Sequence, residues 1–136
     1  MKAKTYRGSC LCGDVRLSFK GTLDDAYFCH CIQCRKNFGM HGASIGVDRE
    51  NLVIKNTKSV RTFRSSKTTV RTFCKRCGSP IAWDREGYER MYVYMGLLEG
   101  QIAPPKIMDI YTEDAGAYYP IGARAKRKSR RPIRAK

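Results

Sequence analysis

Residues 27–35, YFCHCIQCR, place three cysteines within six positions, with a histidine between the first two. Three thiols are more than one disulfide needs and one fewer than a closed four-cysteine zinc site needs. The other four cysteines form two further clusters, CLC at residues 10–12 and CKRC at residues 74–77. All seven cysteines therefore lie at the short spacings that are typical of metal ligands.

Both spacings can direct two thiols toward one ion. Residues two apart on a strand share a face, so a C-x-C pair presents both sulfur atoms on the same side. A C-x-x-C turn does the same, and Gly78 directly after the last pair suits a tight reversal. Two pairs can close a tetrahedral four-thiolate site, which leaves three thiols for a second site with an open position, as in catalytic zinc sites. These spacings do not match those of ferredoxin iron–sulfur clusters, so zinc is favoured.

Spacing alone does not decide which clusters share an ion. A structural zinc ribbon that pairs Cys31 and Cys34 with residues 74 and 77 is the main alternative. It would leave three cysteines outside a metal site: Cys10, Cys12 and Cys29. A zinc nucleobase deaminase is disfavoured, because no H-x-E motif precedes a P-C-x-x-C run.

Length and composition predict one globular domain. A chain of 136 residues can bury a core of its own but is too short for two typical domains. No apolar run approaches membrane-spanning length, and the first ten residues lack the apolar segment of a signal peptide. We therefore expect a cytosolic or nuclear protein, with the cytoplasm as our choice, and no membrane partner. Thiols stay reduced there, so clustered cysteines indicate metal binding or catalysis rather than disulfides.

The net charge of +15 is concentrated at the C-terminus. Residues 123–136, ARAKRKSRRPIRAK, contain eight Lys or Arg and no acidic residue. Residues 1–122 then hold 19 basic and 12 acidic residues, a net charge of +7. We predict a domain over residues 1–122 that attracts anions and a disordered basic tail over residues 123–136.

Most of the predicted domain has the pattern of short strands. Residues 14–21, DVRLSFKG, alternate apolar and polar side chains with the period of two of a half-buried strand. Four later stretches are rich in β-branched and aromatic residues between turn residues, namely 51–56, 59–65, 68–74 and 90–98. Residues 34–42 predict a short helix ended by glycine, and adjacent prolines exclude regular structure over residues 102–107. The sequence therefore predicts a mainly antiparallel β domain.

Four motifs resemble, in order, those of the family named for the glutathione-dependent formaldehyde-activating enzyme (GFA), which includes vertebrate centromere protein V. They are GSCLCGDVRL, FCHCIQCRK, FCKRCGSPI and MGLLEG, within a resemblance from about Gly8 to about Ile121. The resemblance implies antiparallel sheets of the Mss4-like, or β-tent, type, stapled by zinc. It implies two Zn²⁺ per chain. The implied ligands are Cys10, Cys12, Cys74 and Cys77 for a structural zinc, and Cys29, Cys31 and Cys34 for a zinc of the catalytic type.

The resemblance also implies an activity. It implies a zinc-dependent carbon–sulfur lyase acting on small thiol adducts such as S-hydroxymethylglutathione, made from formaldehyde and glutathione. A three-thiolate zinc suits the capture of a thiol better than the polarisation of a carbonyl. Arg35 and Lys36 are candidates to hold the carboxylates of glutathione, although solvated surface is the commoner role for such residues. His30 and His41 are expected on the surface, and no catalytic or cofactor-binding residue is assigned.

A second class of function stays open from sequence. The chain is then a zinc-stabilised binding module whose basic tail contacts nucleic acid. A tail of this composition supplies non-specific phosphate affinity that falls with salt. The three-cysteine cluster favours the enzyme, whereas the tail favours the binding module.

Overall fold

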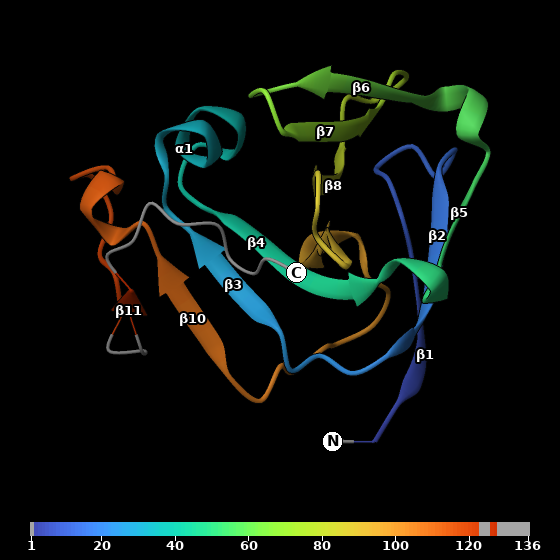
Figure 1. The fold of residues 1–136 in the computed structure, drawn as a ribbon, viewed down its shortest axis with the longest axis horizontal. Helices are drawn as coiled ribbons and strands as arrows, with labels where there is room; N and C mark the ends of the chain where they lie inside the picture. The colour runs from blue at the N-terminus through green and yellow to red at the C-terminus, as the bar shows by residue number, and fades with distance from the viewer. Residues whose placement is uncertain (1, 123–125, 128–136) are drawn as a thin grey trace.

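A computed structural model describes residues 2–122 and 126–127 (Figure 1). Eleven strands of this part of the chain form one sheet of three strands and one of eight. The smaller sheet has the order β1 (Lys4–Ser9), β2 (Arg16–Gly21), β5 (Leu52–Lys55). The larger sheet has the order β11 (Lys126–Arg127), β10 (Ile107–Ile110), β3 (Ala26–Cys29), β4 (Gly42–Asp48), β9 (Arg90–Tyr94), β8 (Pro80–Arg85), β7 (Thr69–Cys74), β6 (Val60–Arg64).

Helical structure in the described residues is short. The α-helix α1 (Ile32–Phe38) follows β3 and ends at Gly39, which has a left-handed φ of 86° and donates its N–H to the carbonyl of Arg35 at 2.8 Å. Four 3₁₀ turns connect strands: η1 (Arg49–Asn51), η2 (Thr57–Ser59), η3 (Met95–Leu97) and η4 (Thr112–Asp114). None of these helices is long and apolar enough to cross a membrane, and the cytoplasmic location stays a prediction.

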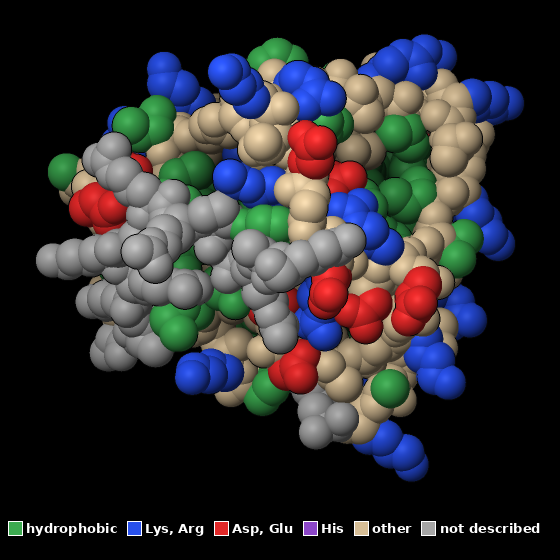
Figure 2. Space-filling model, in the orientation of Figure 1, with side chains coloured by type: hydrophobic (Ala, Val, Ile, Leu, Met, Phe, Trp, Pro, Cys, Tyr) green, Lys and Arg blue, Asp and Glu red, His purple; other side chains and the backbone are tan. Residues whose placement is uncertain are grey.

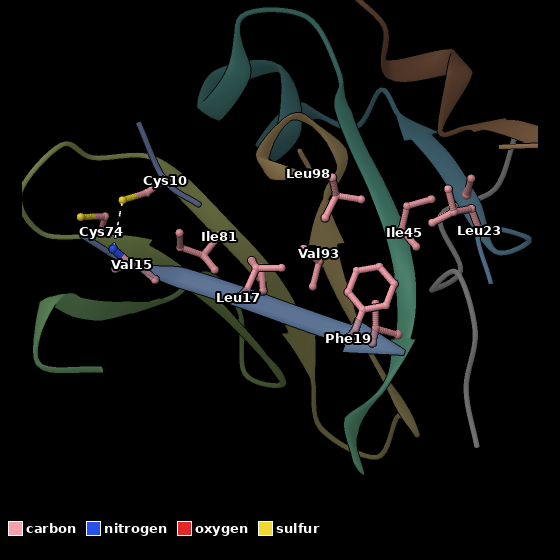
Figure 3. Packing of buried hydrophobic residues seen from close by; sticks show 13 residues of the cluster. Cys10, Val15, Leu17, Phe19, Leu23, Ile45, Cys74, Ile81, Val93 and Leu98 are labelled. Atoms are coloured by element: carbon pink, nitrogen blue, oxygen red, sulfur yellow. Dashed lines mark hydrogen bonds between the residues drawn. The ribbon is translucent and has the colours of Figure 1, made fainter. Parts of the chain in front are cut away.

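The apolar core lies between the two sheets (Figure 3). Leu17 and Phe19 of β2 point toward Ile45 of β4 and Val93 of β9, and each of these side chains is at most 4% exposed. Full burial of such a side chain contributes about 1.5–3 kcal/mol to folding. β2 is therefore the half-buried strand that its alternation predicts: its apolar side chains face this core, and Arg16 and Lys20 are exposed.

The prediction of a mainly β fold is confirmed, with one difference in strand direction. β2, β5, β6, β7 and β9 all fall within the predicted stretches, and residues 102–106 form no helix or strand. The larger sheet is mixed, because β10 pairs parallel with both β3 and β11. The sequence patterns do not predict β1, β3, β4, β8 or β10, which are short, glycine-containing or begin with proline.

Most basic residues of the described chain lie at its surface, whereas Arg71 is buried. Figure 2 shows Lys and Arg side chains along the β6–β7 side and along the side of the three-stranded sheet. The predicted tail lies outside the described residues, except for Lys126–Arg127, which form β11. The division into residues 1–122 and 123–136 stays a prediction.

Gly8 allows β1 to lie close to the 3₁₀ turn that follows β9. It forms an isolated antiparallel bridge with Leu98, and a Cβ at Gly8 would lie 2.4 Å from the backbone oxygen of Leu97. We predict that Gly8→Ala lowers the free energy of unfolding by about 1–3 kcal/mol, because backbone must move to admit the methyl group. Denaturant unfolding measures this loss.

The matched control for Gly8→Ala is Gly96→Ala, since a Cβ at Gly96 meets nothing within 4 Å. Equal stability of the two variants would contradict the close approach of Gly8 to the backbone of Leu97.

Candidate metal centres and the adjoining pocket

Four cysteines from two distant turns form the first cluster. The sulfur atoms of Cys10, Cys12, Cys74 and Cys77 all lie within 4.8 Å of one another. The Sγ atoms of Cys10 and Cys12 are 3.6 Å apart, and those of Cys12 and Cys74 are 3.9 Å apart. Tetrahedral zinc with Zn–S bonds of about 2.3 Å requires S–S separations of about 3.8 Å. The printed separations are close to this value, so the four thiols are suitably placed for a tetrahedral metal ion.

Each turn of this cluster is closed by a left-handed glycine. Gly13 has a φ of 80° and donates its N–H to the Cys10 carbonyl, and Gly78 has a φ of 78° and donates to the Cys74 carbonyl. A residue with a side chain is strained at such φ values, so glycine permits the reversal that brings the paired thiols together.

One further hydrogen bond lies within the first turn, and another joins the two turns. The N–H of Val15 donates to the Sγ atom of Cys10 at 3.3 Å (Figure 3). The N–H of Leu11 donates to the Oγ atom of Ser79 at 2.9 Å, which joins the turn after β1 to the turn after β7. The cluster therefore connects the three-stranded sheet to the eight-stranded sheet.

The thiols of this cluster perturb one another's ionisation. A hydrogen bond with Ser79 is the main cause that lowers the pKa of Cys77 to about 5. The backbone of Asp14 acts to lower the pKa of Cys12, but burial and the neighbouring thiols raise it to about 11. Thiols this close cannot all ionise without a compensating charge, which a divalent cation supplies.

Three cysteines form the second cluster at the junction of β3 and α1. The sulfur atoms of Cys29, Cys31 and Cys34 also lie within 4.8 Å of one another. Cys29 is the last residue of β3, Cys31 is the N-cap of α1, and the Cys31 Sγ atom accepts the N–H of Cys34 at 3.4 Å. Gly42 of β4 lies beside them, because a Cβ there would be 3.3 Å from the Cys34 Sγ atom.

The second cluster also has one thiol that ionises far more readily than the others. Hydrogen bonding with Cys29 and Cys34 lowers the pKa of Cys31 to about 2, and the same contacts raise the pKa of Cys29. A metal cation is needed for all three to ionise together.

The structure divides the cysteines into four and three. It does not bring Cys31 and Cys34 to Cys74 and Cys77, so the zinc-ribbon alternative is wrong. No His, Asp or Glu of the described residues joins the three-cysteine cluster, and the sequence outside those residues contains none of these side chains. Both clusters can hold a metal ion, and the smaller one has only three protein ligands.

His30 is a buried residue, so its predicted surface position is wrong. Its side chain is 1% exposed, and its Nε2 and Nδ1 atoms lie 2.7 Å from Asp109 Oδ1 and 2.6 Å from Tyr119 Oη. Its backbone N–H donates to the carbonyl of Ile110 at 2.9 Å. These bonds attach the segment between Cys29 and Cys31 to β10. Sequence does not reveal the pairing, because Asp109 lies 79 residues away.

His41 is half-buried rather than exposed, so the predicted surface position is wrong here too. Its ring stacks on Phe28 with centroids 4.4 Å apart, and it lies 5.0 Å from the ring of His30. The two histidines and two aromatic rings, Phe28 and Tyr119, form one packed group.

A cavity of about 260 Å³ adjoins the three-cysteine cluster. Four aromatic residues also line it, namely Trp83, Tyr92, Tyr94 and Tyr111. Its lining contains two arginines, Arg71 and Arg85, and no Asp or Glu. The cavity therefore combines three potential metal ligands with positive charge and apolar surface.

The arginines of this cavity are not those that sequence suggests. Arg35 and Lys36 do not line it, and Arg35 instead donates to the backbone oxygen of Asp114 at 3.2 Å. Arg71 of β7 is 8% exposed and donates to Tyr94 Oη at 2.9 Å and to Gln33 Oε1 at 3.0 Å. Burial acts to lower its pKa, but Tyr94 and the nearby thiols outweigh burial and raise it.

The fold and the two cysteine clusters define a mainly β protein with two candidate metal centres, as expected of the Mss4-like type. The family model of the glutathione-dependent formaldehyde-activating enzyme matches residues 5–114, and the chain belongs to this family. The crystal structure of a Rhodobacter sphaeroides protein has a similar fold, with a TM-score of 0.61 and 24% sequence identity. The match covers 71% of this chain and 90% of that chain. No curated protein compared with the chain is a significant match.

We predict that Cys77→Ser prevents stable folding, because it removes one of four ligands that connect the sheets. The expected loss is more than about 5 kcal/mol, which is comparable with the whole stability of a small domain. Soluble yield, thermal unfolding and metal content measure the effect. A soluble variant with unchanged melting and full metal content would contradict a structural role for the first cluster.

We predict that Cys31→Ser empties only the second cluster. The bound metal should fall by about one ion per chain, while the melting temperature stays close to that of the wild type, since the first cluster is intact. Elemental analysis and calorimetry measure the two quantities on the same sample. The comparison with Cys77→Ser is the control, and similar unfolding of both variants would show that the clusters do not have separate roles.

Proposed function

We propose that the protein is a zinc-dependent enzyme of the carbon–sulfur lyase type. It acts on small thiol adducts such as S-hydroxymethylglutathione, the adduct of formaldehyde and glutathione. Family membership supports chemistry of formaldehyde and glutathione. The observation that carries the proposal is that three thiols with no fourth protein ligand in the described chain meet at a cavity.

The two cysteine clusters have different roles in this proposal. Cys10, Cys12, Cys74 and Cys77 hold a structural zinc, because four thiolates complete its coordination. Cys29, Cys31 and Cys34 hold a second zinc and leave space for a ligand from the cavity. If zinc were bound by these three cysteines, it would supply a positive charge that lowers the pKa of a thiol in the cavity toward neutral pH.

Arg85 is placed to bind an anionic group of the substrate. It lines the cavity, and within the described chain it has no ion pair with an Asp or Glu side chain. Its guanidinium carbon lies 5.7 Å from the centre of the Tyr88 ring, which restricts its position. A guanidinium binds a carboxylate with two parallel hydrogen bonds, and glutathione carries two carboxylates.

The size of the cavity indicates how much of a thiol it encloses. About 260 Å³ is slightly below the range of about 300–1,000 Å³ that is usual for pockets enclosing drug-sized ligands. The thiol-bearing part of glutathione then enters the cavity, while the rest of the peptide extends over its rim. Trp83 and Tyr111 line the cavity and offer apolar surface beside the three cysteines.

The reaction is a reversible addition. The thiol sulfur forms a bond to the carbonyl carbon of formaldehyde, the carbonyl π bond breaks, and the oxygen takes up the proton that the thiol loses. The reverse reaction breaks the carbon–sulfur bond and needs no oxidant or reductant. The cavity orients the sulfur toward the carbonyl carbon, and no side chain is assigned as the proton carrier.

Exchange NMR of formaldehyde with glutathione tests this proposal directly. Protein with both sites loaded with zinc should accelerate the exchange over the uncatalysed rate at the same pH, and Cys31→Ser should lose the acceleration. The variant is a suitable control because it retains the first cluster. No acceleration with glutathione or other cellular thiols would favour the alternative, a zinc-stabilised module whose basic tail over residues 123–136 contacts nucleic acid.

A further inference from the structure

Arg71 is a buried cation that no carboxylate neutralises within the described chain. Its side chain is 8% exposed, and its two hydrogen-bond acceptors, Tyr94 Oη and Gln33 Oε1, are neutral. Other arginines do have carboxylate partners, namely Arg16, Arg49, Arg76 and Arg90. A buried charge is costly unless an opposite charge compensates it. The environment of Arg71 must therefore supply negative charge from another source.

The three-cysteine cluster is that source. Arg71 lines the same cavity as Cys31 and Cys34 and interacts electrostatically with both thiols. Three thiolates with one divalent ion leave one net negative charge, and a thiolate as fourth ligand adds another. Without a nearby cation, the second negative charge would be strongly unfavourable in a partly buried site.

We infer that Arg71 is the charge partner of the three-cysteine metal site, and that it makes an anionic thiolate acceptable as the fourth ligand. This inference rests on the metal site of the proposed function and deepens it. It assigns Arg71 a role in selecting a thiolate over a neutral ligand, whereas Arg85 contacts the remainder of the substrate.

The contacts of Arg71 fix its guanidinium relative to the metal ligands. Gln33, which accepts from Arg71, lies on α1 between Cys31 and Cys34. The Oη atom of Tyr94 on β9 accepts a second hydrogen bond from the Arg71 guanidinium at 2.9 Å. The helix that carries two of the three cysteines thus also orients the compensating charge. Arg71 acts through the metal site and is a positioning residue rather than a catalytic one.

Two substitutions separate charge from shape. Arg71→Met removes the charge with little change in side-chain length, and Arg71→Lys retains the charge. Arg64→Met is a matched surface control, because Arg64 is an exposed arginine on the neighbouring strand β6. Each full-length protein is loaded with Co²⁺, and visible absorption follows titration with 2-mercaptoethanol, which binds as a thiolate, and with imidazole, which binds as a neutral ligand.

Arg71→Met should weaken the binding of 2-mercaptoethanol by about tenfold or more, because loss of one partner from a buried charge pair is costly. Its binding of imidazole should change by less than about threefold, because the metal site gains no second negative charge from that ligand. Arg71→Lys should recover most of the affinity for 2-mercaptoethanol, and Arg64→Met should match the wild type. If Arg71→Met does not fold, Arg71→Gln takes its place with the same expected result, because glutamine is uncharged but keeps hydrogen-bond donors.

Equal weakening of both ligands, or no change in either, would overturn the inference, since a purely structural role does not distinguish a thiolate from a neutral ligand. A wild-type chain that never holds more than one metal ion would contradict the proposed function itself. Measurement of metal content before each titration keeps these two failures apart.

Discussion

Four sulfur atoms meet where the turn after β1 approaches the turn after β7, and this contact sets the relation between the two sheets. The apolar core also lies between the sheets, but hydrophobic contacts are non-directional and do not by themselves select one alignment. The thiol cluster has a tetrahedral requirement, so it specifies both distance and orientation. β7 carries both Cys74 and Arg71. The first cluster therefore also determines where the buried arginine stands relative to the second cluster.

A different set of contacts positions the cysteines of the second cluster. The hydrogen bonds of His30 to Asp109 and Tyr119 and the parallel pairing of β3 with β10 hold the segment that carries Cys29 and Cys31. Asp109 is fully buried, so these bonds are shielded from water and favour a single arrangement of the segment. The three thiols are thus brought together by packed structure as well as by any ion they bind. This explains why loss of that ion should leave the fold intact, whereas loss of the first should not.

The sequence shows the cysteine clusters and five of the eleven strands, because both have a local signature. The alternation in β2 and the spacing of the cysteines can be recognised within a few residues. The partners of His30 and Arg71 cannot, since Asp109, Gln33 and Tyr94 lie 23 or more residues away from the residues they contact. Arg71 also belongs to a strand that sequence predicts correctly, yet its burial depends on helix α1 and strand β9. Positions that depend on several distant elements therefore appear only when the fold is known.

The aromatic wall of the cavity has an optical consequence. Trp83 is the only tryptophan in the chain, and it packs edge-on against Tyr88 and Tyr92, with centroids 5.7 and 5.5 Å apart, while also lining the cavity beside the three cysteines. Indole emission responds to the polarity and quenching groups around it, so all the tryptophan fluorescence of this protein originates at the cavity wall. The chain thus carries an intrinsic fluorophore whose emission reports on what enters the cavity and on paramagnetic ions bound beside it, without an added label.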